Sequence, residues 1–184
     1  VRDLAALGAT VEAMDPGFDD PLDITCGLWF AGAWTIWNTL TPAQQQVTDP
    51  DFRAEVEIGA TLSALELQRL HIRRGALGSH MRQFMERVDL LVTPAVAVPA
   101  FEARPPGHTP FSPQSMLGWT PFSYPFNLTQ QPAASINCGF TKSGLPVGLQ
   151  IVGPMHADAL VLRAARAFET VYPARMPDLS KLRR

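Results

Sequence analysis

Several residue types are scarce in this sequence, and each shortage argues against a class of protein. Only two cysteines are present, Cys26 and Cys138, and both lie in apolar segments far apart in the chain. This favours reduced, buried thiols in a cytoplasmic protein over a disulfide framework. With two lysines and a formal net charge of -2, the chain offers no basic stripe for direct binding of nucleic acid or anionic lipid. None of the four histidines lies three or four residues from another histidine or from a cysteine, so we expect no metal. The sequence also has no phosphate-binding glycine loop, and we expect no organic cofactor.

A long uninterrupted apolar run is also absent. Residues 22–40 form the most apolar long segment, but polar residues such as Asp23 and Asn38 interrupt it, whereas a membrane-spanning helix needs about 20 apolar residues in succession. We therefore predict a buried helix and no membrane association. One aromatic face of this helix can be either a core stripe or the wall of a substrate pocket. The residues of this face are Cys26, Phe30, Trp34 and Trp37.

Residues 51–89 have a strong helical pattern. It predicts two helices with a break near Gly59 or Thr61, and Gly75 and Gly78 lie in the second helix where a crossing element can pack closely. The other face carries arginines interspersed with glutamates, which is typical of a solvated surface with ion pairs. The predicted inner face comprises Leu77, Met81, Phe84, Met85 and Val88.

The remaining segments predict different kinds of local structure. Residues 10–14 predict a short strand, and the apolar run 90–93, ended by a proline, predicts a strand buried on both faces of a sheet. Residues 94–125 are rich in proline and predict an irregular loop that serves as a lid or a pocket rim. Residues 155–172 predict a helix, and residues 175–184 predict a loosely ordered tail. The expected inner face of the helix comprises Leu160, Ala164, Phe168 and Val171.

The clearest pattern lies in residues 127–153. Two runs of alternating apolar and polar residues flank a turn at Gly144 and Pro146, which predicts two antiparallel strands. Gly148 and Ser135 are small residues inside these strands, so we expect another part of the chain to pack very close to one face. The alternating apolar residues are Ala134, Ile136, Cys138, Val147, Leu149 and Ile151.

The same stretch closely resembles the carboxy-terminal motif of the amidase signature family, in which an Asn precedes Pro-Ala-x-Ser and Gly-Leu-Pro-Val-Gly-x-Gln-Ile-Val-Gly follows. Gln130 departs from the motif, because the family usually has Gly there. The resemblance implies an α/β fold in which helices cover a mixed β-sheet, with about four strands from this chain. Residues 1–184 would then be the carboxy-terminal portion of the domain, without its catalytic first half, and we expect further sequence before Val1. The matching residues are Asn127, Pro132, Ala133, Ser135, Gly139, Gly144, Leu145, Pro146, Val147, Gly148, Gln150, Ile151 and Gly153.

The catalytic residues that the resemblance implies are not found in this chain. Family members use a serine nucleophile, a second serine held by a cis peptide, a lysine, and backbone amides of a loop rich in glycine and serine. This sequence has no adjacent serine pair, and its lysines, Lys142 and Lys181, lie in a turn and in the tail without a suitable serine. Ser79 and His80 are neighbours on a helix and point to different sides. We therefore assign no catalytic residue.

Substrate contacts are the role that the resemblance leaves to this chain. In the family the segment before the motif Asn faces the acyl side of the substrate, although its aromatic residues can equally fill the core. The amidotransferase branch places an Asp at the position of Thr120, and an Arg a few residues ahead of an Ile/Leu-Gly pair, where this chain has Glu55, Val56 and Glu57. Without this charged pair we expect a neutral aryl or aliphatic acyl group. The expected substrate-binding residues are Trp119, Thr120, Phe122, Tyr124, Phe126 and Asn127.

The sequence thus indicates the carboxy-terminal portion of an amidase that hydrolyses a carboxylic amide. The alternative is a binding or assembly half, belonging either to a split enzyme or to the A subunit of a tRNA-dependent amidotransferase. The expected partners are a small-molecule amide, the missing amino-terminal half of the domain and a second copy of the chain.

Overall fold

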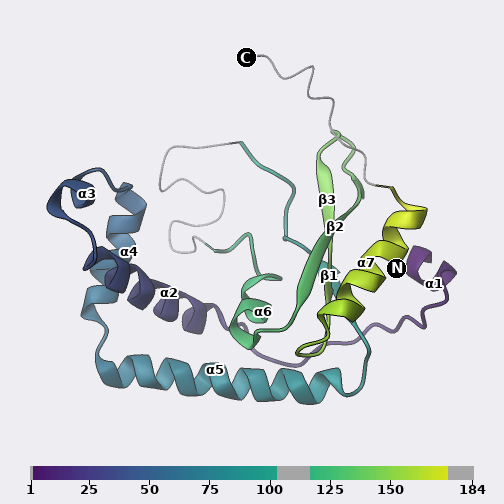
Figure 1. Ribbon diagram of the computed structural model, residues 1–184, viewed down its shortest axis with the longest axis horizontal. Helices are drawn as coiled ribbons and strands as arrows, with labels where there is room; N and C mark the ends of the chain where they lie inside the picture. The colour runs from purple at the N-terminus through teal and green to yellow at the C-terminus, as the bar shows by residue number, and fades with distance from the viewer. Residues whose placement is uncertain (1, 103–116, 174–184) are drawn as a thin grey trace.

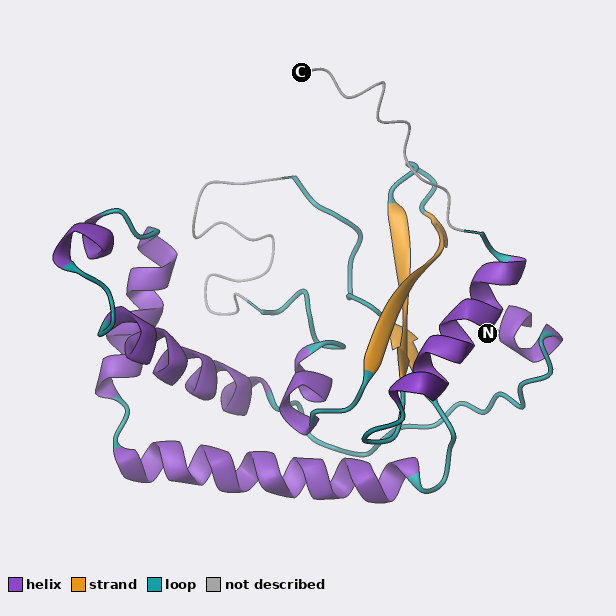
Figure 2. Cartoon of the chain, viewed as in Figure 1, coloured by secondary structure: helices purple, strands orange, loops and turns teal. Residues whose placement is uncertain are grey.

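The computed structural model describes residues 2–102 and 117–173, which form a group of helices beside a small β-sheet (Figures 1 and 2). α5 runs beneath both the helices and the sheet (Figure 1). α7 lies beside the sheet, on the side opposite to α3 and α4 (Figure 1). The expectation of an α/β fold is confirmed. The elements are α1 (Arg2–Ala6), α2 (Leu22–Trp37), α3 (Pro42–Gln46), α4 (Pro50–Thr61), α5 (Ala64–Met85), β1 (Leu91–Pro94), α6 (Tyr124–Thr129), β2 (Ala133–Phe140), β3 (Pro146–Val152) and α7 (Asp158–Val171).

The described strands form one antiparallel sheet in the order β1-β3-β2. Val152 of β3 lies opposite Leu91 of β1 and Ala133 of β2, and its side chain is completely buried. The predicted pair of antiparallel strands is therefore confirmed as β2 and β3. Gly144 has φ +88° in the turn between them, a left-handed conformation that glycine adopts without a steric penalty.

β3 connects two hydrophobic clusters, because successive side chains of a strand point to opposite faces of the sheet. Ile151 packs on the side of α7, where Val161, Ala165 and Phe168 are buried. Val152 packs on the opposite side, in a cluster that α5 and α6 share. The buried members of this second cluster are Ile24, Leu77, Met81, Phe84, Met85, Phe126, Leu128 and Val152.

The two helices predicted in residues 51–89 are confirmed as α4 and α5. Ser63 separates them and caps α5, since its hydroxyl accepts a hydrogen bond from the Glu66 amide at 3.2 Å while the Glu66 carboxylate accepts one from the Ser63 amide at 2.8 Å. The predicted inner face of the second helix is also confirmed. Its buried residues are Leu77, Met81, Phe84 and Met85, with Val88 packed alongside.

α2 forms where a helix was predicted, but the prediction of a buried helix is wrong. Trp29 is 57% exposed and Trp34 is 38% exposed, and α2 is covered mainly by α4 on one side. The two helices approach so closely that a side chain at Gly59 would collide with the backbone carbonyl of Phe30. This contact explains Gly59 in the interior of α4, where glycine otherwise lowers helix stability.

Close packing was predicted at Gly75 and Gly78, and the structure contradicts it. A Cβ atom at either position would meet no heavy atom within 4 Å, so both glycines face open space in the described part of the chain. The predicted strand at residues 10–14 is also wrong, because these residues form neither a helix nor a strand. Three strands rather than about four are thus found among the described residues.

β1 confirms a strand near residues 90–93, but it is not buried on both faces. It is an edge strand that pairs with β3 alone among the described strands, and its residues are half-buried or exposed. α7 confirms the last predicted helix with its inner face shifted by about one residue, since Val161 and Ala165 are buried beside Phe168 whereas Val171 is 50% exposed. Residues 103–116 of the predicted loop, and the predicted tail at 175–184, lie outside the described residues.

Candidate functional site

The residues expected to contact the substrate lie in segment 117–127, which ends in α6. A compact turn opens the segment, because both the amide and the hydroxyl of Thr120 donate hydrogen bonds to the Leu117 carbonyl, at 2.9 and 2.8 Å. The Ser123 amide then donates to the Thr120 carbonyl at 2.9 Å. The Thr120 side chain is therefore engaged within its own turn.

Segment 117–127 is fastened to the sheet by Gln150 of β3. The Gln150 side-chain amide donates to the Phe122 carbonyl at 2.6 Å and to the Thr93 hydroxyl of β1 at 2.9 Å. Gln150 is only 8% exposed, and it lies opposite Thr93 in the pairing of β1 with β3. A buried amide needs partners of this kind, because an unsatisfied polar group in the interior is destabilising. The contact thus joins β1, β3 and segment 117–127 through one side chain.

The stretch after β1 holds the segment from the other side. The Ser123 hydroxyl donates to the Ala95 carbonyl at 3.1 Å, and the Ala97 amide donates to the Trp119 carbonyl at 3.1 Å. The Trp119 ring also meets Phe101 edge to face, with ring centroids 5.9 Å apart. Two stretches far apart in sequence therefore lie side by side over one end of the sheet.

Gly148 allows this arrangement because it lets the chain after β1 approach β3. A Cβ atom at Gly148 would lie 2.7 Å from the Ala95 Cβ and 3.1 Å from the Ser135 hydroxyl oxygen. The Ala95 amide donates to the Gly148 carbonyl at 3.0 Å. The predicted close approach at Gly148 and Ser135 is confirmed.

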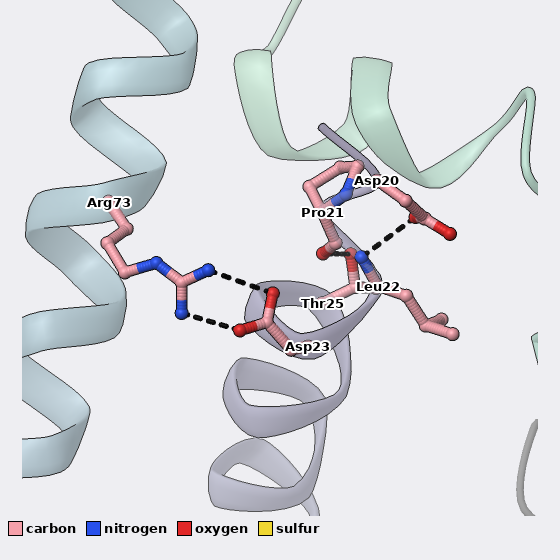
Figure 3. Close-up of polar contacts among 6 residues, drawn as sticks. All are labelled: Asp20, Pro21, Leu22, Asp23, Thr25 and Arg73. Carbon is pink, nitrogen blue, oxygen red and sulfur yellow. Dashed lines mark hydrogen bonds and ion pairs between the residues drawn. The ribbon is translucent and has the colours of Figure 1, made fainter. Parts of the chain in front are cut away.

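The far end of the segment is fixed by Tyr124, which is buried at the start of α6. Its hydroxyl donates to an Asp20 carboxylate oxygen at 2.6 Å. The same oxygen accepts a hydrogen bond from the Leu22 amide at 3.0 Å, which Figure 3 shows. Burial, together with the Asp20 carboxylate, raises the pKa of Tyr124 far above its usual value of 10.0, so the phenol stays protonated. Tyr124 acts here as a hydrogen-bond donor that links α6 to the start of α2.

The start of α2 is also tied to α5. Figure 3 shows Arg73 of α5 facing Asp23, and its guanidinium donates to the two carboxylate oxygens at 2.5 and 3.0 Å. The Arg73 guanidinium holds the pKa of Asp23 below its ordinary value. Both side chains are more than half exposed, so this ion pair is weak, at less than about 1 kcal/mol. The expected ion-paired surface of α5 is thus confirmed at Arg73.

Glu55 of α4 is a buried carboxylate near the same helices. It is 8% exposed, and one of its oxygens accepts a hydrogen bond from the Trp29 indole at 2.9 Å. Burial raises the pKa of Glu55, and the hydrogen bond from Trp29 opposes this shift. An acidic side chain therefore lies just ahead of the Ile58-Gly59 pair, where the resemblance to the amidotransferase branch would place an arginine.

The structure separates the expected substrate-binding residues into an inner and an outer group. Tyr124 and Phe126 are buried, and Phe126 belongs to the hydrophobic cluster of α5, while Asn127 is exposed. The half-buried residues between these extremes are Trp119, Thr120 and Phe122. Their substrate contacts stay a prediction.

Two hollows lie elsewhere on the described surface. One of about 230 Å³ between α2 and α4 is lined by Trp34, Trp37 and Arg53. Arg53 already donates to the carbonyls of Gln46 and Thr48. The other hollow, of about 270 Å³, is lined by the end of α5 and by Pro154 and Leu160.

Some features of this site were missed in the sequence. Gln150 was noticed only as a member of the motif, although a polar residue between Leu149 and Ile151 in an apolar run was a signal of a buried hydrogen bond. Asp20 gave no signal, because its partner Tyr124 is more than 100 residues away in the chain.

The other polar groups give no sign of catalysis or metal binding in the described part of the chain. Ser79 accepts a hydrogen bond from Arg82, whereas His80 contacts the Pro16 carbonyl, so the two side chains serve different partners as expected. No group of three or more histidine, cysteine, aspartate or glutamate side chains there could hold a metal ion. The helices described include none with both the length and the apolar character that crossing a membrane requires.

The chain is similar in sequence to known amide-cleaving and amide-transferring proteins. Residues 3–162 match the family model described as Amidase. The chain is 32% identical to an acylamidase of Rhodococcus erythropolis over 178 residues, which are 91% of this chain and 36% of the relative. It is 45% identical to the A subunit of glutamyl-tRNA(Gln) amidotransferase from Myxococcus xanthus over 84 residues, which are 46% of this chain and 17% of the relative.

The fold of the chain is also similar to that of a solved structure. A bacterial aryl acylamidase of the amidase signature family superposes with a TM-score of 0.81 at 24% identity, covering 94% of this chain and 39% of that structure. The chain thus spans a little over a third of the length of the acylamidases that it resembles. On the match of the family model over most of its residues, the chain belongs to the amidase family.

Proposed function

We propose that this chain is the carboxy-terminal portion of an amidase that hydrolyses a neutral aryl or aliphatic carboxylic amide. Segment 117–127 and the sheet beneath it form the acyl side of the substrate pocket. The nucleophilic serine, the second serine and the lysine of the family mechanism come from amidase sequence that residues 1–184 do not contain. The observation that carries the proposal is the lack of charged residues in the two described stretches that meet here, residues 91–101 and 117–131.

Both stretches that meet at this place are uncharged. Residues 91–101 and 117–131 contain no Asp, Glu, Lys, Arg or His, and the hydrogen bonds of Ser123 and Ala97 join the two stretches. A charged substrate group would lose its water here without gaining an opposite charge, which costs several kcal/mol. A neutral acyl group avoids this cost, so the composition supports a neutral substrate.

The charged groups that touch this region are already engaged. The Arg74 guanidinium donates to the Leu128 carbonyl at 2.8 Å, and the Asp20 carboxylate accepts from Tyr124. Each group thus already has a partner within the protein, through Nε of Arg74 and one oxygen of Asp20. This supports selection by shape and apolar contact, as in most small-molecule sites.

The alternative is the amidotransferase branch, and the 45% identity to the Myxococcus xanthus protein favours it. Two features of the chain oppose glutamine as the substrate. Thr120 stands at the position of the Asp that would bind the amino group, and its hydroxyl is bonded to the Leu117 carbonyl. The resemblance places the arginine of that branch a few residues ahead of Ile58-Gly59, where this chain has Glu55, which is bonded to the Trp29 indole, so no cation stands there to pair with the carboxylate of glutamine.

The proposed partners follow from the same assignment. A small-molecule amide is the substrate, and the catalytic portion of an amidase domain completes the site. Large exposed apolar side chains on the helices support such a covering partner, which can also include a second copy of this chain. We propose a cytoplasmic location on the basis of the cysteine content. The most exposed of these side chains on α2 and α5 are Trp29, Ile36, Leu65 and Ile72.

Labelling with a fluorophosphonate probe tests the division of labour between the two portions. The 184-residue chain is expected to show no labelled serine and no turnover of benzamide, because no serine in its described part is hydrogen-bonded to a histidine or lysine that could act as its base, and Ser79 and His80 serve different partners. Together with an amidase catalytic portion, labelling should appear on that portion alone, and benzamide should be hydrolysed. Stoichiometric labelling of a serine within residues 1–184, located by mass spectrometry, would contradict the proposal.

A further inference from the structure

We propose that Gln150 is a positioning residue that sets the acyl-group selectivity of the enzyme by fixing the Phe122 carbonyl. This inference rests on the proposed amidase function. Gln150 touches no catalytic group in the described chain, so it acts through segment 117–127. The structure gives it two acceptors, the Phe122 carbonyl at 2.6 Å and the Thr93 hydroxyl at 2.9 Å.

The geometry makes Gln150 the central support of this part of the segment. Its side chain emerges from β3, the middle strand of the described sheet, and the residue is buried. Thr93 lies directly opposite on β1 and uses its own hydroxyl hydrogen on the Pro94 carbonyl at 2.9 Å. The Thr93 oxygen therefore accepts one N–H of the Gln150 side-chain amide. The same amide nitrogen has a second N–H, which is available for the Phe122 carbonyl.

The Phe122 carbonyl has this one side-chain donor among the described residues. The Ser123 amide belongs to the same peptide unit as the Phe122 carbonyl and donates to the Thr120 carbonyl, so Gln150 supplies the support on the carbonyl side of that peptide. Losing this second support would let the peptide tilt and the half-buried Phe122 ring change position. A bulky aromatic acyl group that packs against the segment would then bind less well, whereas a small acyl group would be little affected.

The test uses Gln150→Met, which keeps the length of the side chain and removes both donors. In the enzyme assembled with its catalytic portion, KM for benzamide should rise about tenfold, as expected for one lost hydrogen bond, with kcat nearly unchanged. The kinetic constants for acetamide should stay within about twofold. Hydrogen exchange in the 184-residue chain should increase at the amides of Ser123 and Tyr124, which close the turn on the Thr120 carbonyl.

Gln131 supplies a matched control, because it is also a glutamine with 8% exposure. Its side chain bonds Thr129 and the Gly153 carbonyl and does not contact segment 117–127. Gln131→Met should lower stability without changing the ratio of benzamide to acetamide turnover. Thr93→Val removes one acceptor and keeps the Phe122 bond, so it should also preserve the ratio.

The outcomes separate this proposal from the function on which it rests. Unchanged exchange at Ser123 and Tyr124 in Gln150→Met would overturn the positioning role. Increased exchange with an unchanged substrate ratio, or an equal change in Gln131→Met, would overturn the role in selectivity. If the unsubstituted assembled enzyme hydrolyses neither amide, the proposed function fails and selectivity fails with it. The exchange data then still decide whether Gln150 holds the segment.

Discussion

Gln130 is predicted to lower the stability of the chain through its own backbone. It follows α6 with φ 61° and ψ 28°, a left-handed conformation, and its amide donates to the Phe126 carbonyl at 2.9 Å. For a residue with a Cβ atom this conformation costs about 1 to 2 kcal/mol, while glycine adopts it without that cost. The amidase motif usually has glycine at this position, so the departure noted in the sequence coincides with strain in the structure.

Gln130→Gly should therefore stabilise the chain. The relief of about 1 to 2 kcal/mol is offset by the extra entropy that glycine brings to the unfolded state, about 0.5 to 1 kcal/mol, which leaves a gain of about 0.5 to 1 kcal/mol. The Gln130 side chain is exposed and makes no hydrogen bond with the described residues, so little is lost with it. For a chain of 184 residues this corresponds to a rise in Tm of about 1 to 4 °C.

Urea and thermal unfolding followed by circular dichroism provide the measurement. Gln130→Ala is the control, because it removes the same side chain and keeps the Cβ atom, and it should give no gain. Gln130→Asn should fall between the two, since asparagine tolerates the left-handed region better than most residues. A gain in Gln130→Ala equal to that in Gln130→Gly would refute the explanation by backbone strain, and so would a loss in Gln130→Gly.

Three further predictions concern packing and charge. Gly59→Ala should destabilise the folded chain by about 2 kcal/mol, because α2 leaves no room for a methyl group, whereas Gly75→Ala should stabilise it by up to about 1 kcal/mol. Equal effects of the two substitutions in urea unfolding would contradict this packing. Arg73→Gln should lower the free energy of unfolding by less than about 1 kcal/mol at pH 7. This loss should disappear as acid protonates Asp23 below its ordinary pKa of 3.8, and a loss that persists at pH 2 would refute the ion pair. Glu55→Gln should stabilise at pH 7, because burial raises the pKa of the carboxyl and so penalises the ionised form. The difference should vanish below pH 4.5, and a loss of stability at pH 7 would contradict this sign.

Local patterns predicted the parts of the fold that depend on near neighbours in sequence. α5 followed from the spacing of Leu77, Met81 and Phe84, and the pair β2 and β3 followed from alternation around the turn at Gly144. In both cases the pattern that drives local structure is the same pattern that becomes buried.

The failures have a common cause, which is that partners distant in sequence decide the outcome. Residues 10–14 look like a strand but find no neighbour among the described strands, and the apolar run of β1 lies at the edge of that sheet. Of the glycines in α4 and α5, Gly59 rather than Gly75 is closely packed, because the position of α2 determines which of them has a near neighbour. Sequence spacing carries no information about that position.

The candidate site divides in the same way. The resemblance pointed to segment 117–127, but it gave no role to Gln150 and no partner to Tyr124. Their hydrogen bonds join residues 28 and 104 positions apart in the chain. Only the fold brings these groups together, so the supports of the site became visible in the structure alone.

The most direct test of the central claim is the ratio of kcat/KM for benzamide and for glutamine in the enzyme assembled with its catalytic portion. An uncharged acyl side should disfavour glutamine by about a hundredfold or more, since each 1.4 kcal/mol of unpaired charge is worth about tenfold. Thr120→Asp should lower benzamide turnover without rescuing glutamine, because Glu55 still offers no partner for the glutamine carboxylate. A ratio near one, or one that favours glutamine, would contradict the account and assign the chain to the amidotransferase branch.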